Sequence, residues 1–123
     1  MLPIITDEQL WENIRGLVGK VIYTPDQHRP NRIRNVSKNL VEFEDRNSHP
    51  SKDDLFYCYH LVLQHGILIE RNTPKYFFDH RIARICYALL AEATPKQIRA
   101  FRRREGPPAA QGLSGIEVYN RDC

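Results

Sequence analysis

Apolar residues first recur at helical spacing near the N-terminus of the chain. They stand three and four residues apart and form one stripe: Leu10, Trp11, Ile14, Leu17 and Val18. Thr6 and Gln9 precede the stripe at the spacing of a capping box, in which each side chain bonds the backbone amide of the other residue. The pattern predicts a helix that begins after Thr6 and ends at Gly19, since glycine is the usual residue at a helix C-terminus.

The next segment alternates between apolar and polar residues, as strands with one solvated face do. Residues 20–24 (KVIYT) are rich in β-branched and aromatic residues, and residues 32–45 contain two alternating runs around a turn at Ser37. In the second run, Val41 and Phe43 alternate with two glutamates. We therefore expect the first helix to be followed by a three-stranded antiparallel meander.

Two further helices are predicted in the second half of the chain. Ser51 stands before acidic residues, as an N-cap does, and Gly66 is a suitable stop, so a helix is expected over about 51–65. The next apolar stripe predicts the strongest helix of the chain. Its members are Ile82, Ile85, Cys86, Leu89 and Leu90. Both Thr73, which precedes a proline, and Asp79 could begin this helix.

The last third of the chain contains a fourth helical signal and two short runs with strand character. Thr94 followed by Pro95 repeats the pattern of a helix start, so a helix is predicted over about 95–105. Residues 67–70 (ILIE) could form a strand or a simple connection. Residues 116–119 (IEVY) could return to the sheet as an edge strand.

The order of the predicted elements, a helix, three strands and then three helices, favours an α+β fold, because long alternation of strand and helix is absent. A chain of 123 residues has the length of one domain. We expect residues 1–105 to form a compact α+β domain with the later helices packed on the sheet. Residues 106–123 would add a C-terminal loop and the edge strand to the same domain.

Composition favours a soluble, cytoplasmic protein. No apolar run approaches the roughly 20 residues that cross a bilayer, and the first residues do not resemble a signal peptide, so no membrane partner is expected. The chain has an odd number of widely spaced cysteines, Cys58, Cys86 and Cys123, whereas a secreted disulfide framework normally has an even number in a denser pattern. Cys58 and Cys86 fall on apolar stripes and are expected to be buried thiols.

The catalytic and metal-binding motifs in the sequence are incomplete. Cys58, His60 and His65 are the closest group of metal-ligand types, but on a helix His60 would point away from the other two. Glu42 and Glu44 would share one face of a strand, yet the lysine that restriction-type nucleases place after their acid is absent. We therefore expect no metal, no cofactor and no catalytic residue, and a binding protein is favoured over an enzyme.

The positive charge of the protein is concentrated in one segment. The chain carries 18 Lys and Arg against 15 Asp and Glu, a net charge of +3. Residues 96–104 hold five cations and no acid, so the rest of the chain has a net charge of −2. These cations are Lys96, Arg99, Arg102, Arg103 and Arg104. On the predicted helix, Ile98 and Phe101 would dock against the domain while the cations face solvent.

This basic segment predicts a small non-enzymatic nucleic-acid-binding module in which the five cations contact phosphates. Arginine suits bidentate contact with phosphate, and Arg81 and Arg84 would extend the patch if the last two helices meet at Ala93. An acidic protein surface is an alternative partner. A solvated helix end is the plain alternative, because the helix dipole stabilises cations near a helix C-terminus.

The aromatic run Tyr76, Phe77 and Phe78 supports the competing hypotheses. Such a run is typical of a core or of an interface between subunits. The alternative is therefore a structural or interaction protein, either a homodimer or an accessory subunit. The same three residues could instead line a pocket for a small molecule.

Overall fold

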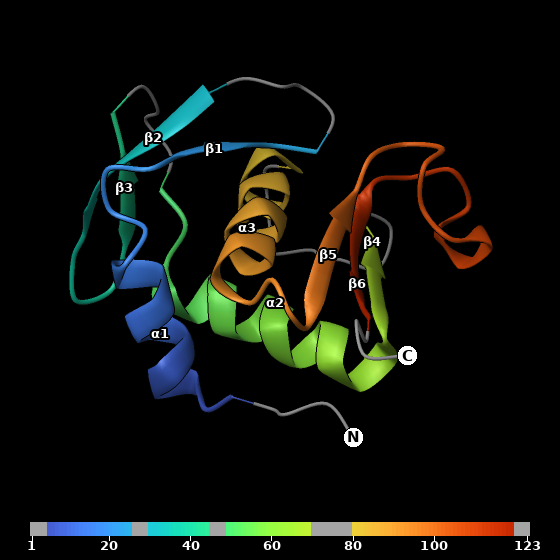
Figure 1. The fold of residues 1–123 in the computed structure, drawn as a ribbon, viewed down its shortest axis with the longest axis horizontal. Helices are drawn as coiled ribbons and strands as arrows, with labels where there is room; N and C mark the ends of the chain where they lie inside the picture. Colours follow the sequence, from blue (N-terminus) through green and yellow to red (C-terminus); the bar gives the residue numbers. More distant parts are fainter. Residues whose placement is uncertain (1–4, 26–29, 45–48, 70–79, 120–123) are drawn as a thin grey trace.

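The computed structural model describes residues 5–25, 30–44, 49–69 and 80–119. Within them, two small antiparallel sheets lie on either side of a central helix, α3 (His80–Ala93) (Figure 1). Helices α1 (Asp7–Arg15) and α2 (Lys52–His65) lie below α3 in this view. The predicted α+β class is confirmed.

Helix α1 begins as the sequence predicts but ends earlier. Thr6 accepts a hydrogen bond from the backbone amide of Gln9 at 3.1 Å, while the Gln9 side chain donates to Asn13 instead of returning to Thr6. The helix stops at Arg15, not at Gly19, and leaves Val18 46% exposed. The prediction for Val18 was wrong because the backbone after Gly16 turns away to join the first sheet.

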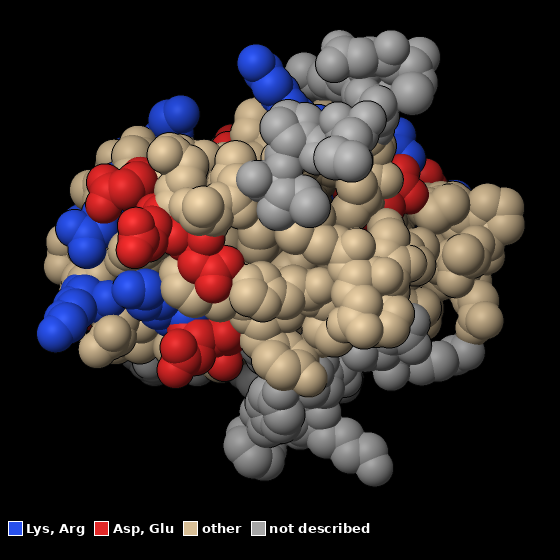
Figure 2. Space-filling view, turned by 90° about the horizontal axis from the view of Figure 1, so that it is seen from below, with Lys and Arg blue, Asp and Glu red and all other residues tan. Residues whose placement is uncertain are grey.

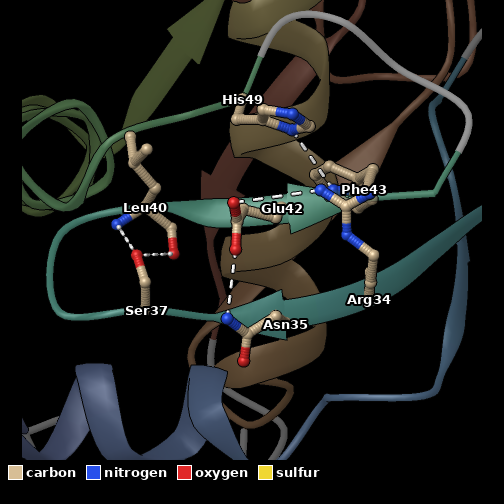
Figure 3. Close-up of polar contacts among 7 residues, drawn as sticks. All are labelled: Arg34, Asn35, Ser37, Leu40, Glu42, Phe43 and His49. Carbon is tan, nitrogen blue, oxygen red and sulfur yellow. Dashed lines mark hydrogen bonds and ion pairs between the residues drawn. The ribbon is translucent and has the colours of Figure 1, made fainter.

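The first sheet is a meander in sequence order, which agrees with the predicted succession of a helix and then a meander. Its strands are β1 (Val21–Tyr23), β2 (Pro30–Val36) and β3 (Val41–Phe43). Alternate residues are buried in the core: Ile22, Ile33, Val41 and Phe43. Ser37 closes the β2–β3 turn, because its hydroxyl accepts from the backbone amide of Leu40 at 3.1 Å (Figure 3).

Helix α2 has both of the end signals that the sequence shows. The Ser51 hydroxyl accepts from the amide of Asp54, and the Asp54 carboxylate accepts from the amide of Ser51, which is a complete capping box. Gly66 ends the helix with a φ of +80°, a left-handed conformation that glycine adopts without strain. The predicted bounds are confirmed.

Helix α3 buries most of the residues whose side chains the structure describes, although Arg84 is only half-buried and Glu92 is exposed. Its buried residues are Ala83, Ile85, Cys86, Tyr87, Ala88, Leu89, Leu90 and Ala93. Cys58 of α2 and Cys86 are both fully buried, which confirms the prediction for these thiols, whereas Cys123 lies outside the described residues. The competing helix starts at Thr73 and Asp79 also lie outside them.

The second sheet contains β4 (Ile67–Ile69), β5 (Ile98–Phe101) and β6 (Gly115–Val118), in the order β4-β6-β5. Strand β6 is antiparallel to both neighbours, so β4 and β5 run parallel to each other and are joined through α3. The predicted edge strand over residues 116–119 therefore forms, but as the central strand of this sheet.

The helix predicted over residues 95–105 was wrong. Thr94 does not cap a new helix, because its hydroxyl donates to the carbonyl of Leu90 at 2.6 Å and so belongs to the end of α3. The chain then turns and enters β5, which pairs with β6. Ile98 and Phe101 lie on opposite faces of this strand, Ile98 in the main core and Phe101 in a small second cluster. Pairing with a strand later in the sequence decides this conformation, which local spacing cannot reveal.

Candidate functional site

The five predicted cations lie along β5 and its two flanking turns, and all are exposed. Lys96 precedes the strand, Arg99 lies within it, and the other three follow it in a turn that we call the arginine turn (residues 102–105). A strand of four residues spans about 13 Å, so Lys96 and the arginine turn lie at opposite ends of β5. The segment is displayed at the surface, but from a strand and a turn rather than from a helix.

Arg99 contacts an acidic residue, Glu117, that lies outside residues 96–104 and so was not included in the net charge of that segment. Arg99 lies directly opposite Glu117 in the register of β5 and β6, and the two side chains form an ion pair. The Glu117 side chain is only 15% exposed, whereas that of Arg99 is 54% exposed. Arg99 is therefore partly neutralised in place.

The arginine turn is closed by backbone hydrogen bonds. The amide of Glu105 donates to the carbonyl of Arg102 at 3.1 Å, and the amide of Arg104 donates to the carbonyl of Gly112 at 3.1 Å. The guanidinium of Arg102 also lies 3.9 Å from the carboxylate of Glu105. With Glu105 and Glu117 included, five cations and two carboxylates leave a net charge of +3 at this part of the surface.

Arg104 has a backbone conformation that a side chain disfavours. Its φ is +66°, in the left-handed region, which costs an L-residue roughly 1–2 kcal/mol. Glycine or asparagine would be the expected residue at such a position. Strained residues of this kind often occur at functional sites, which makes Arg104 a candidate functional residue of the turn.

The loop after the arginine turn rests on a small apolar cluster on the outer face of the second sheet. Ile69, Phe101 and Ala110 form this cluster. A Cβ atom at Gly106 would lie 2.3 Å from the Phe101 ring, so only glycine lets the backbone lie this close to the ring. The cluster thus fixes the base of the turn.

The opposite end of β5 is held by a buried tyrosine. Tyr59 of α2 donates its hydroxyl hydrogen to Gln97 at 3.1 Å, and the carbonyl of Gln97 accepts from the amide of Tyr119. Burial raises the pKa of Tyr59 above its ordinary value, and the carboxylate of Asp7 adds to this rise. The protonated, neutral form of Tyr59 is therefore favoured at the point where α2 contacts Gln97, which follows Lys96 in the chain.

The end of β1 approaches the end of β5 (Figure 1). An open cleft of about 320 Å³ lies there, beside the arginine turn. It is lined by Tyr23, Thr24, Pro25, Ala100, Phe101, Arg102 and Glu105. Tyr23 is 56% exposed. The sequence predicts that it lies on a strand, which it does, but gives no sign that it belongs to a binding site. The cleft joins the ends of both sheets, so no local pattern in the sequence could have indicated it.

The two glutamates that suggested a nuclease are paired with basic and polar groups. The Glu42 carboxylate lies between Asn35, which donates to it at 3.0 Å, and Arg34, at 3.8 Å (Figure 3). Glu44 lies 3.6 Å from Arg32. Glu42 and Glu44 therefore pair with residues of β2, and this structural role accounts for their presence without a catalytic one. Within the described part of the chain, no three His, Cys, Asp or Glu side chains gather as a metal site would require.

Where described residues are visible from below, both acidic and basic residues are present (Figure 2). Acidic and basic residues are interspersed on the left of this face, the α1 side of the molecule, whereas the middle of the face is largely uncharged. Helix α2 accounts for this, because it contains no Lys, Arg, Asp or Glu between Leu55 and His65.

The other candidate residues from the sequence do not add to this site in the described part of the chain. Tyr76, Phe77 and Phe78 lie outside the described residues, so the homodimer and pocket hypotheses based on them stay predictions. Arg84 lies half-buried on α3, and the helix corner that would have joined it to the patch does not form, since β5 follows α3. The Arg81 side chain is not described.

No known family model matches the chain, and no curated protein or solved structure matches it. In the ranges that the structure describes, no helix combines the length and the apolar composition needed to span a bilayer.

Proposed function

We propose that the protein is a small non-enzymatic nucleic-acid-binding module. Its contact surface is the arginine turn, together with Arg99 within β5 and Lys96 before that strand. The observation that carries this proposal is the display of three consecutive exposed arginines on a turn closed by backbone hydrogen bonds. The left-handed backbone of Arg104 supports it, because an arginine stands where glycine would be less strained, and strained residues often occur at functional sites.

The arginine turn suits phosphate binding because a phosphate can compete with the Glu105 carboxylate for Arg102. The pair of Arg102 and Glu105 is exposed and 3.9 Å apart, and such surface pairs contribute about 0–1 kcal/mol, so a phosphate can replace the carboxylate at little cost. A guanidinium can also hold a phosphate through two parallel hydrogen bonds. Arg99 contributes less, because its partner Glu117 is more deeply buried.

Fluorescence anisotropy with labelled oligonucleotides tests the proposal. If only the three arginines of the turn contact phosphates, the slope of log K against log salt should be near −2.7 for duplex DNA and −2.1 for single strands. Affinity for a duplex would then fall about 40-fold between 50 and 200 mM salt. The variant in which Arg102, Arg103 and Arg104 are all changed to Ala should lose most of this binding.

Arg34→Ala provides a matched control, because Arg34 is an equally exposed arginine with a glutamate partner on the first sheet. It should bind oligonucleotides as the wild-type protein does. The proposal would be wrong if no oligonucleotide bound below about 100 µM at low salt, or if the triple variant bound as tightly as the wild type. An acidic protein partner would instead be indicated by binding of polyglutamate alone.

A further inference from the structure

We infer that the cleft beside the arginine turn receives one unpaired nucleobase, and that the nucleic acid bound by this protein is therefore single-stranded. This inference rests on the proposed function, since it assumes that the arginine turn contacts phosphates. It adds the class of nucleic acid and a residue, Tyr23, that lies on β1, outside the basic segment.

Tyr23 provides an aromatic surface at the cleft. Tyr23 is one of the residues that line the cleft, and it is 56% exposed, the most exposed of the large hydrophobic residues in the described ranges. Bases of single-stranded nucleic acids stack on such rings regardless of sequence, because every base has a π-face. Tyr57 of α2 is also exposed, at 41%, but it is not among the residues that line the cleft, so it offers a matched comparison.

The charges around the cleft are compatible with a neutral nucleobase inside the cleft and with phosphate groups beside it. Glu105 lines the cleft, and its carboxylate disfavours an anion within it. Arg102 also lines the cleft, and a planar guanidinium can stack on a base as well as pair with a phosphate. Arg103 and Arg104 follow in the chain and are exposed next to the cleft, where they can hold the phosphates that flank the inserted base.

The size and position of the cleft favour a single base rather than a longer ligand. Its volume of about 320 Å³ is at the lower end of the 300–1,000 Å³ typical of small-molecule sites. A duplex keeps its bases paired and stacked, so it would have to unpair and unstack a base before the cleft could accept it. A single strand presents its bases without this step, which predicts preferential binding of single strands.

Anisotropy titrations with three probes test the inference: a single-stranded oligonucleotide of mixed sequence, an abasic oligonucleotide of the same length, and a duplex. Tyr23→Ala should weaken binding of the base-containing single strand about 5- to 150-fold, the effect of losing one stacked base. It should leave binding of the abasic strand and of the duplex unchanged. Tyr23→Phe, which keeps the ring, should restore binding, and Tyr57→Ala should have no effect on any probe.

The outcomes separate this inference from the proposed function. If the triple arginine variant loses binding of all three probes but Tyr23→Ala changes none of them, the base site is wrong while the phosphate surface stands. If Tyr23→Ala weakens all three probes equally, Tyr23 acts through the fold, and the base site is again wrong. If no probe binds the wild-type protein, both proposals fail.

Discussion

The two sheets of this protein differ in how far along the chain their contacts reach. In the first sheet, Asn35 bonds Glu42, only 7 positions away, and the strands lie side by side in sequence order. In the second sheet, Arg99 pairs with Glu117, 18 positions away, and β6 lies between strands that precede it in the chain. The first sheet is thus a local structure, whereas the second depends on tertiary contacts.

The two sheets also differ in how many of their positive charges are matched by nearby carboxylates. The arginines of the first sheet contact glutamates on the neighbouring strand, as Arg34 contacts Glu42, so their charges are locally balanced. Around β5, the five cations outnumber the two carboxylates Glu105 and Glu117, and three of the five cations belong to the arginine turn. The proposed binding surface therefore lies on the part of the molecule that local patterns describe least well.

The largest predicted effect comes from truncating a core residue in the central strand of each sheet. Ile33 of β2 and Ile116 of β6 are both almost completely buried in the same core cluster, so changing either to Ala should lower the free energy of unfolding by about 2–5 kcal/mol. The kinetics should differ. Because local contacts form before distant ones, we expect Ile33→Ala to slow folding and Ile116→Ala mainly to speed unfolding.

Stopped-flow folding and unfolding in urea would measure these rates for both variants. The distinction between a local and a tertiary sheet would be contradicted if Ile116→Ala slowed folding more than Ile33→Ala did. One core cluster joins the two sheets, so we expect them to unfold in a single transition. Separate transitions would contradict that expectation.

A smaller effect is expected where α2 holds the turn before β5. Tyr59→Phe removes the donor to Gln97 and should lower the free energy of unfolding by about 1–3 kcal/mol near neutral pH, because a buried acceptor loses its partner. Tyr57→Phe, an exposed position on the same helix, is the control and should change it by less than about 0.5 kcal/mol.

The pH dependence of stability gives a second test of Tyr59. Burial, together with Asp7, raises the pKa of Tyr59 in the folded protein above its ordinary value of 10.0. Its contribution is therefore complete below pH 10 and is lost as the pH rises through the pKa of the folded state. Urea unfolding at a series of alkaline pH values should show a shallower decline for Tyr59→Phe than for the wild type. An equally steep decline in both proteins would show that Tyr59 does not titrate in this way.

The smallest predicted change in stability is at Arg104 and has the opposite sign. Glycine adopts a φ of +66° without the strain that an arginine bears, so Arg104→Gly should raise the free energy of unfolding by up to about 1 kcal/mol. Urea unfolding would measure the change. A clear loss of stability would mean that the arginine side chain makes contacts that outweigh the strain in its backbone.

Local signals in the sequence were sufficient for much of the fold. Thr6, Ser51 and Gly66 mark helix ends through contacts with residues within a few positions, and the turn at Ser37 is equally local. The segment after Thr94 shows the limit of such signals. Its spacing fits a helix as well as a short strand, and only pairing with β6 distinguishes the two.

The candidate site was predictable only in part for the same reason. The exposed cations could be found from charge alone, because five of them stand close together in the sequence. The carboxylate opposite Arg99 and the ring of Tyr23 come from other strands, so their positions relative to the arginines exist only in the folded protein. The charge balance and the cleft therefore required the structure.

The central claim is that the arginine turn contacts phosphates. The most direct test is the salt dependence of oligonucleotide binding for the wild type and Arg104→Gly, with Gln111→Gly as a control, because Gln111 also has a left-handed backbone but carries no charge. We predict that Arg104→Gly weakens binding and makes the slope of log K against log salt less steep by about 0.7 for single strands, while Gln111→Gly leaves it unchanged. An unchanged slope for Arg104→Gly would contradict the claim.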